Sequence, residues 1–178
     1  NIVISGAAQM QNYKIFSERI KTEYKKLLKL KEDDKLLCYA GSSRGLNETA
    51  QLEILDKFID NKKIKNLKLL YKPHPWKNFS NSDELDFFNY NFKNIIIDPY
   101  SVENYKLRFK GSGTINIDLI DQEYTKKVLN SIDALFTPMS TIMLEATMMG
   151  IPTCVYYPIQ EQEFSLGFRN DLGRKMFI

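Results

Sequence analysis

His74 is the residue of this 178-residue chain with the clearest capacity for chemistry, because it is the only histidine. It comes after the apolar run 67–71 and Lys72, and it lies between Pro73 and Pro75. Each proline restricts the backbone around it, so the pattern predicts an imidazole held rigidly just after a buried strand. In open α/β sheets, ligands bind at the carboxyl ends of the strands. We therefore expect His74 to donate a hydrogen bond to a phosphate oxygen or to act as a general acid or base; capping of a neighbouring carbonyl is the structural alternative.

A glycine- and serine-rich turn follows an earlier apolar run. It consists of Gly41, Ser42, Ser43 and Arg44, with a second glycine after them. Glycine permits close approach of the backbone to a ligand, the serine hydroxyls can form hydrogen bonds, and the Arg44 guanidinium suits a phosphate. The turn matches neither the Walker motif nor the GxGxxG pattern of dinucleotide sites. It predicts a phosphate contact, and an ordinary surface turn is the alternative.

A third loop carries Ser140 and Thr141 at the expected start of a helix. Their hydroxyls and the free backbone amides there suit an anion, with simple N-capping as the alternative. Glu145 is the only charged residue between Asp133 and Glu161, and its helix is otherwise largely apolar. A buried glutamate without a polar partner is costly, so we expect it to face a polar group such as ribose hydroxyls. Stabilisation by the helix dipole is the structural alternative.

These three loops need a scaffold that brings them together. The expected strands are 35–40, 67–71, 95–97, 134–137 and 153–157, and the expected helices are 9–31, 48–59, 82–90, 121–132 and 140–149. Such alternation of strand and helix predicts an α/β fold, a Rossmann-like parallel sheet with helices on both faces.

Residues 100–119 interrupt this alternation. Lys106–Lys110 and Thr114–Leu119 flank Gly111-Ser112-Gly113, which predicts a small hairpin. An engineered loop replacement is the alternative for the Gly-Ser-Gly segment. The tail 158–178 is mixed in character and is expected to return as a helix across the sheet.

Length and composition fit one domain over residues 1–178, with no apolar run long enough to span a membrane and no secretory signal. Cys38 and Cys154 lie in apolar runs and are expected to be buried thiols. Without a second histidine or a CxxC pair they form no metal site, and free thiols are typical of a reducing, cytoplasmic compartment. The acidic run Glu32-Asp33-Asp34 is interpreted as a solvated turn.

The charge pattern offers a further interpretation. A net charge of +3 is weak support for an anionic ligand. The expected helix 9–31 carries Lys14, Glu18, Lys21, Lys25 and Lys29 on one side, and such a lysine-rich face suits a membrane surface or a nucleic acid. We favour a helix packed on the sheet with a solvated lysine face, because glutamates interrupt the lysines.

Taken in order, the loops resemble the donor-binding half of GT-B fold glycosyltransferases. The closest likeness is to bacterial sialyltransferases, polysialyltransferases and the glycerophosphotransferases of wall and capsule polymers. In these families a His-Pro pair follows a strand and a Ser-Ser or Ser-Thr pair opens a later helix, matched here by His74-Pro75 and Ser140-Thr141. Glu145-Ala146 and Gly150-Ile151-Pro152 match a broader GT-B pattern. The resemblance runs over residues 35–157, and Thr141 stands where a second serine is common.

The resemblance implies a carboxyl-terminal half of a two-domain enzyme, cut from a longer protein, whose acceptor half usually supplies the catalytic base. It implies metal-independent transfer, without a cofactor, of a sugar from a nucleotide-activated donor to a surface glycan or lipid-linked acceptor. A CMP-sialic-acid-like donor is favoured, in bacterial capsule or lipopolysaccharide synthesis. The segment alone would be inactive. The full-length protein is expected in the cytoplasm, at the inner face of the cell membrane and peripherally associated with it, without a nucleic-acid partner.

The resemblance also assigns roles to the candidate residues. His74 and the Ser140-Thr141 helix start would stabilise the leaving phosphate, Arg44 and Lys72 would assist, and Glu145 would fix the ribose. The full set implied to hold the donor is Gly41, Ser42, Ser43, Arg44, Lys72, His74, Pro75, Ser140, Thr141 and Glu145.

Four alternatives stay open. An enzyme like UDP-N-acetylglucosamine 2-epimerase shares the fold and the Glu-plus-Gly-Pro helix, although it requires more catalytic carboxylates and histidines. An enzyme like CDP-glycerol glycerophosphotransferase is the second. A non-catalytic nucleotide-binding module is the third, and a nucleic-acid binder that uses the basic segment Lys14–Lys35 is the fourth.

Overall fold

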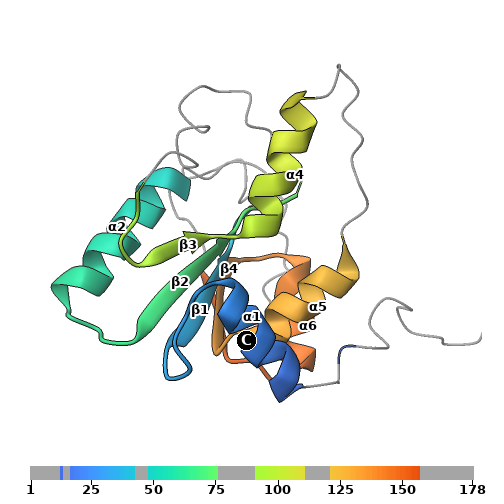
Figure 1. Ribbon diagram of the computed structural model, residues 1–178, viewed down its shortest axis with the longest axis horizontal. Coiled ribbons are helices and arrows are strands. Elements are labelled where there is room, and N and C mark those ends of the chain that lie inside the picture. Colours follow the sequence, from blue (N-terminus) through green and yellow to red (C-terminus); the bar gives the residue numbers. More distant parts are fainter. Residues whose placement is uncertain (1–12, 14–16, 43–47, 76–90, 111–120, 157–178) are drawn as a thin grey trace, which may run out of the picture.

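The computed structural model describes residue 13 and residues 17–42, 48–75, 91–110 and 121–156, with the backbone alone for 105–110. The strands are β1 (Lys35–Ala40), β2 (Leu67–Lys72), β3 (Ile95–Ile97), β4 (Ala134–Pro138) and β5 (Thr153–Tyr156). The helices are α1 (Glu18–Leu27), α2 (Glu48–Asn61), α4 (Pro99–Lys110), α5 (Gln122–Ser131) and α6 (Thr141–Met148) (Figure 1).

All strand pairs in this part of the chain are parallel, in the order β3-β2-β1-β4-β5. The central strand β1 places Leu37 opposite Leu69 of β2 on one side and Ala134 of β4 on the other. Strands β2 and β3 are added on one side of β1, and strands β4 and β5 are added on the other side. The strand order therefore reverses between β1 and β4, which is the topological switch point of the sheet. Ligands bind at the carboxyl edge of such sheets beside the switch point.

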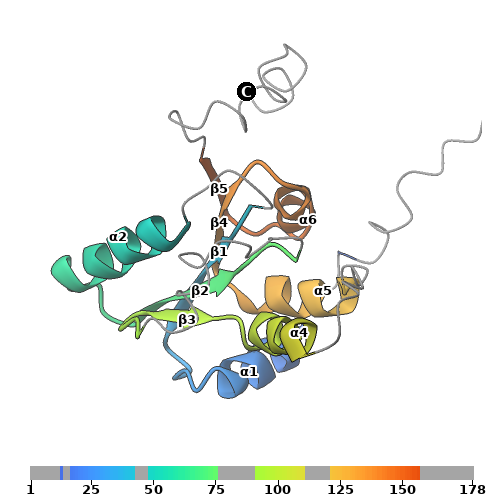
Figure 2. The same cartoon turned by 90° about the horizontal axis from the view of Figure 1, so that it is seen from above.

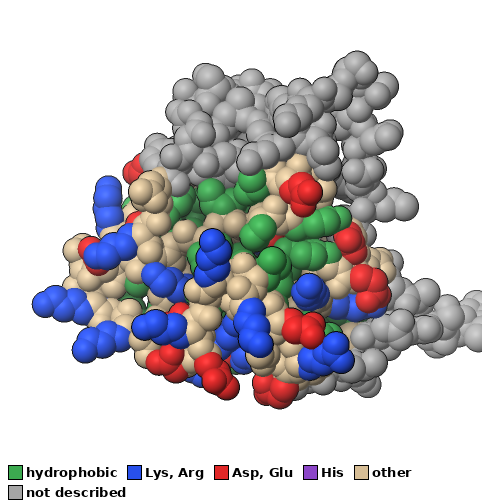
Figure 3. All heavy atoms as spheres, viewed as in Figure 1, with side chains coloured by type: hydrophobic (Ala, Val, Ile, Leu, Met, Phe, Trp, Pro, Cys, Tyr) green, Lys and Arg blue, Asp and Glu red, His purple; other side chains and the backbone are tan. Residues whose placement is uncertain are grey.

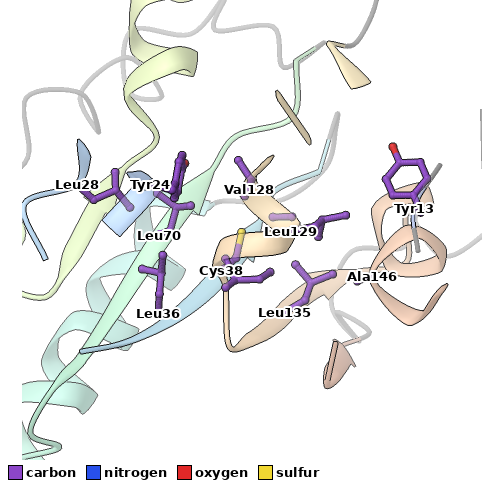
Figure 4. Close-up of a cluster of buried hydrophobic side chains, with 12 residues drawn as sticks. Tyr13, Tyr24, Leu28, Leu36, Cys38, Leu70, Val128, Leu129, Leu135 and Ala146 are labelled. Atoms are coloured by element: carbon purple, nitrogen blue, oxygen red, sulfur yellow. The ribbon is translucent and has the colours of Figure 1, made fainter. Parts of the chain in front are cut away.

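Helices cover both faces of the sheet, as expected for strands that are apolar along their whole length. Figure 2 shows α2 on one side and α1, α4, α5 and α6 on the other. The cluster on the second side is drawn in Figure 4 and consists of Tyr13, Tyr24, Leu28, Leu36, Cys38, Ala40, Leu70, Val128, Leu129, Ile132, Leu135 and Ala146. The cluster beneath α2 consists of Tyr39, Leu52, Ile59, Leu69, Tyr71 and Ile95. The predicted Rossmann-like α/β fold is therefore confirmed.

The prediction of a hairpin at 106–119 is wrong for its first part, because residues 106–110 belong to α4. The start of this helix explains the difference. The Asp98 side chain accepts hydrogen bonds from the Ser101 backbone N–H at 3.2 Å and from its hydroxyl at 2.6 Å. Pro99 occupies the first helical position, where its missing N–H is not needed. Asp-Pro at the end of β3 therefore starts a helix.

The first helix is shorter than the expected 9–31. It begins after Ser17, whose Oγ accepts the Ile20 N–H at 3.4 Å, and it ends before Lys29, which has a φ of 56°. The elements expected at 82–90, 111–119 and 158–178 lie outside the described residues. Within the described ranges, no helix is both long and apolar enough to cross a bilayer.

Two predictions about single side chains are wrong. Lys25, expected on the solvated face, is buried, and its Nζ donates to the carbonyls of Glu32 at 2.8 Å and Asp34 at 2.6 Å. Cys154, expected to be buried, is exposed because β5 is the outermost strand on its side of the described sheet. Cys38, on the central strand, is buried as predicted.

Candidate functional site

The Lys72 charge acts on both His74 and Glu145 at the carboxyl edge of the sheet. Lys72 ends β2, His74 follows two residues later, and Glu145 lies in α6, directly after β4. The Lys72 charge is the second cause, after burial, that lowers the pKa of His74. The same charge opposes the rise that burial imposes on the pKa of Glu145. The fold thus brings together three of the residues that the sequence singled out.

His74 is an uncharged hydrogen-bonding group at neutral pH. Burial, and then the Lys72 charge, lowers its pKa to about 4. The adjacent Pro73 is buried, which holds the imidazole on a fixed backbone. A neutral imidazole donates from one ring nitrogen and accepts at the other, and an anion nearby favours its protonation. The neutral imidazole can therefore donate a hydrogen bond to a phosphate. Once the phosphate is bound, its charge favours protonation of the ring.

Glu145 is half-buried and has protein groups close to it. Burial raises the pKa of the Glu145 carboxyl, while the Tyr13 hydroxyl and the Lys72 charge act in the opposite direction. Burial is also the main cause that raises the pKa of Tyr13, followed by the Glu145 charge. In the described part of the chain the Tyr13 hydroxyl is buried and makes no hydrogen bond of normal geometry. The polar partners expected for Glu145 thus include Lys72 and Tyr13.

A second buried carboxyl, Asp98, lies at this edge and was missed by the sequence analysis. It accepts hydrogen bonds from the hydroxyls of Tyr124, Tyr24 at 3.3 Å and Ser101 at 2.6 Å. Burial, followed by the Asp98 charge, raises the pKa of both tyrosines, so their hydroxyls stay protonated as donors. The Lys72 Nζ lies 5.9 Å from the centroid of the Tyr124 ring. Asp98 therefore fixes the aromatic ring that lies beneath the Lys72 ammonium.

The start of α6 does not use its serine as a cap. Ser140 is the N-cap residue, but its side chain makes no capping hydrogen bond. Its Oγ lies 3.0 Å from the Thr137 Oγ1, and Thr141 is exposed. Simple N-capping by the Ser140 hydroxyl, the structural alternative for this residue, is therefore not what the structure shows. The first-turn amides lack that internal acceptor and are oriented to favour an anion.

The turn after β1 is held by an acidic residue that the sequence analysis treated only as the first residue of a helix. Ser42 N–H donates to the Glu48 Oε1 at 2.5 Å, and Gly41 N–H donates to the Lys72 carbonyl at 2.9 Å. Glu48 is 2% exposed. An acid in the first helical turn is common, so no pattern in the sequence marked it as buried. Ser43 and Arg44 lie outside the described residues.

Aromatic rings fill the α2 side of the same edge. The Tyr39 hydroxyl lies 2.5 Å from the Gln51 Oε1 and 2.6 Å from the Tyr156 hydroxyl. The Tyr156 ring stacks on Phe136 with centroids 4.6 Å apart. These contacts connect β1, β4 and β5 with α2 on that side of the sheet.

The acidic run after α1 is less solvated than predicted. Asp34 is buried and its carboxylate accepts the Lys31 N–H at 2.8 Å, while Asp33 accepts from the Asn66 amide at 2.8 Å. Across the described ranges, no three His, Cys, Asp or Glu side chains are grouped in a way that would hold a metal ion.

Comparisons with known proteins give distant likenesses to solved structures. No protein-family model and no curated protein matches the sequence. A structure assigned as UDP-N-acetylglucosamine 2-epimerase from Listeria monocytogenes is similar over 89% of this chain and 36% of that one, with 15% identity and a TM-score of 0.49. The wall teichoic acid polymerase TagF, soaked with CDPG, is similar over 84% of this chain and 30% of that one, with 19% identity and a TM-score of 0.48.

Two further structures show the same kind of likeness. MnaA of S. aureus with UDP is 17% identical over 85% of this chain and 34% of that one, with a TM-score of 0.43. KpsC from Thermosulfurimonas dismutans, a beta Kdo 2,7 transferase, is 17% identical over 83% of this chain and 44% of that one, with a TM-score of 0.35. The chain thus spans less than half of each of these structures. Likenesses this distant do not assign a function.

Proposed function

We propose that this chain is the nucleotide-sugar-binding domain of a GT-B type glycosyltransferase that works without a metal ion. The observation that carries the proposal is the convergence of Lys72, His74 and Glu145 at the carboxyl edge of a parallel sheet, beside the uncapped start of α6. This edge is where open α/β folds bind their ligands. The ligands of two distant structural neighbours, UDP and CDPG, are compatible with the proposal.

Each residue of the cluster has a distinct task in this proposal. Lys72 supplies positive charge to the donor phosphate, and His74 donates a hydrogen bond to it from a fixed backbone. The first turn of α6, with Ser140 and Thr141, gives further donors. Such donors, preorganised where negative charge develops on the leaving nucleotide, lower the barrier to transfer. Glu145 accepts hydrogen bonds from the ribose hydroxyls.

The turn after β1 completes the proposed site. The Ser42 and Ser43 hydroxyls and the Arg44 guanidinium would contact the nucleotide, and Pro75 would hold His74 in place. The acceptor and the catalytic base would come from another part of the longer protein. We keep a CMP-sialic-acid-like donor as the favoured substrate, on the resemblance of the His-Pro and Ser-Thr motifs alone.

Calorimetric titration of the chain with CMP, CDP and UDP at pH 7 tests this proposal. We expect saturable binding of at least one nucleotide. His74→Ala and Glu145→Ala should each weaken it about tenfold or more, since a hydrogen bond to a charged group contributes roughly 1.5–3 kcal/mol. Leu144→Ala, an exposed neighbour of Glu145 at 41% exposure, is the matched control and should change little. Absence of nucleotide binding, or an equal loss in the control, would overturn the proposal.

Nucleic-acid binding by the first helix is a weaker candidate. Lys25 is buried against backbone carbonyls, and the Lys21 Nζ is paired with the Asp133 Oδ1 at 2.9 Å, so two of its lysines face the protein. On the face shown in Figure 3, Lys and Arg side chains are interspersed with Asp and Glu and form no patch of a single sign. Strongly salt-dependent RNA or DNA binding, with no nucleotide binding, would favour this candidate instead.

Activity assays on the longer protein would distinguish the enzymatic alternatives. An epimerase would interconvert free nucleotide sugars, a glycosyltransferase would need an acceptor, and a glycerophosphotransferase would use CDP-glycerol. A module that binds nucleotides without catalysing a reaction would show neither donor hydrolysis nor transfer.

A further inference from the structure

We propose that Glu48 is a positioning residue of the nucleotide site, whose carboxylate occupies the turn after β1 as a built-in anion and directs the donor phosphate toward Lys72 and His74. This inference rests on the proposed function for the ligand, but its geometry stands on the contacts of Glu48 alone.

The Glu48 carboxylate joins two strand ends. Its Oε1 accepts the Ser42 N–H at 2.5 Å, and its Oε2 accepts the Tyr71 hydroxyl. Ser42 comes just after β1, and Tyr71 lies in β2 immediately before Lys72. With 2% of its surface exposed, Glu48 is closed off from solvent on the first turn of α2. A buried carboxylate is retained only where it is well partnered, and here its partners are the two ends that carry the site.

Gly41 shows how closely the carboxylate fits against the turn. A Cβ placed on Gly41 would lie 2.7 Å from both Glu48 oxygens, so a side chain there would force the carboxylate to shift from its two hydrogen bonds. The glycine expected to admit a ligand therefore admits the Glu48 carboxylate. The described start of the turn does accommodate a carboxylate, but that carboxylate belongs to the protein.

The two backbone amides at the start of this turn consequently already have acceptors. The Gly41 amide donates to the Lys72 carbonyl, and the Ser42 amide donates to Glu48. A donor phosphate placed at these two amides would find no free N–H and would lie next to a like charge. Among the described residues, Lys72, His74 and the start of α6 offer positive charge or hydrogen-bond donors at this edge. Glu48 thus directs the phosphate away from the Gly41 and Ser42 amides, and its bond with the Tyr71 hydroxyl ties it to β2 next to Lys72.

Chemical rescue separates this role from simple structural support. Glu48→Ala removes the carboxylate and leaves a space that acetate can fill. In this variant we expect the affinity for CMP to fall at least tenfold and the hydrogen exchange of the Ser42 amide to speed up at least a hundredfold. Sodium acetate should restore part of both, and sodium chloride at equal ionic strength should restore neither. Leu52→Ala, a buried residue one turn later on α2, is the matched control for lost stability.

Two milder variants keep the test decisive if Glu48→Ala does not fold. Glu48→Gln retains an acceptor for Ser42 and should keep most of the protection of its amide. Tyr71→Phe removes one partner of the carboxylate and should weaken CMP binding by a smaller factor. Equal losses in Leu52→Ala and Glu48→Ala, or a Ser42 amide that stays protected without the carboxylate, would overturn the inference. If the wild type binds no nucleotide, the proposed function fails, and the exchange of the Ser42 amide with its acetate rescue alone decides whether Glu48 holds the turn.

Discussion

Lys72 and Tyr124 meet at the carboxyl edge of the sheet, with the Lys72 Nζ 5.9 Å from the centre of the Tyr124 ring. They come from β2 and α5, on either side of β3 and α4 in the chain. The hydroxyl of the same tyrosine donates to the buried Asp98 carboxyl. The cation that we assign to the donor phosphate is thus supported by a ring that a buried carboxyl holds in place.

The two functions of Tyr124 are separable by substitution. Tyr124→Phe keeps the ring and removes a hydrogen bond to a buried carboxyl, so the free energy of unfolding should fall by about 1–3 kcal/mol. Its affinity for CMP should stay within about twofold of the wild type. Tyr124→Leu also removes the ring and should weaken CMP binding by about two- to fivefold, the range of a cation–π contact. Denaturant unfolding and calorimetry check the two effects, and a Tyr124→Phe variant that loses affinity as strongly as Tyr124→Leu would contradict the assignment.

His74 makes both stability and binding depend on pH. Its pKa is lowered from 6.5 to about 4 in the folded chain, mainly by burial. Between these two values the unfolded chain binds more protons, so His74 stabilises the fold fully above pH 6.5 and this stabilisation is lost as the pH falls toward 4. A bound phosphate favours the protonated imidazole, so the affinity for CMP relative to that of a variant without the histidine should rise as the pH is lowered from 7 toward 5.

Unfolding and binding titrations over this pH range check the sign of both effects. His74→Gln, which does not titrate, is the control: it should weaken the pH dependence of stability, and its binding profile should report the protonation of the CMP phosphate itself, at about pH 6. A wild-type affinity that falls on acidification in parallel with His74→Gln would show that His74 does not meet the phosphate.

Gly41 and Glu48 should be coupled energetically. Gly41→Ala places a methyl group against the Glu48 carboxylate, so we expect a loss of about 1–3 kcal/mol in unfolding free energy, as for overpacked sites. In a Glu48→Ala background the same change should cost much less, because the oxygens that it meets are gone. A double-mutant cycle measures this coupling. Additive effects of the two substitutions would mean that the carboxylate does not lie against the glycine.

The two cysteines should differ in reactivity. Burial raises the pKa of the Cys38 thiol to about 12, while Cys154 is exposed on β5. A thiol reagent should therefore modify one cysteine in the native chain, identified as Cys154 by peptide mapping, and both after denaturation. Rapid modification of Cys38 in the native chain would contradict the position of β1 at the centre of the sheet.

The fold was largely predictable from the sequence, because buried parallel strands leave short continuous apolar runs. The strands at 35–40 and 95–97 have the predicted bounds, and the predicted helix at 121–132 corresponds to α5 with Asp121 and Ile132 as its caps. The segment that starts with Asp98-Pro99 was misjudged, since the cap that begins α4 comes from a side chain that looked like the end of a strand. The exposure of Cys154 depends on which strand lies outermost, and local pattern does not encode that.

The sequence could predict only those residues of the candidate site whose side-chain type is unusual for their position. His74 stood out as a lone histidine between prolines, and Glu145 as a lone charge in an apolar helix. Glu48 looked ordinary at a helix start, and Asp98 looked like the end of a strand. Their roles depend on partners such as Tyr71 and Tyr24, 23 and 74 residues away, which only the folded chain brings close.

The most direct test of the central claim compares two lysines on one strand. Lys72 lies at the carboxyl end of β2 and Lys68 near its amino end, so each substitution by alanine removes one positive charge from the same element. The affinity for CMP, measured by calorimetry at fixed low salt, should fall at least tenfold in Lys72→Ala and less than about twofold in Lys68→Ala. Equal affinities in the two variants would contradict a nucleotide site at this edge of the sheet.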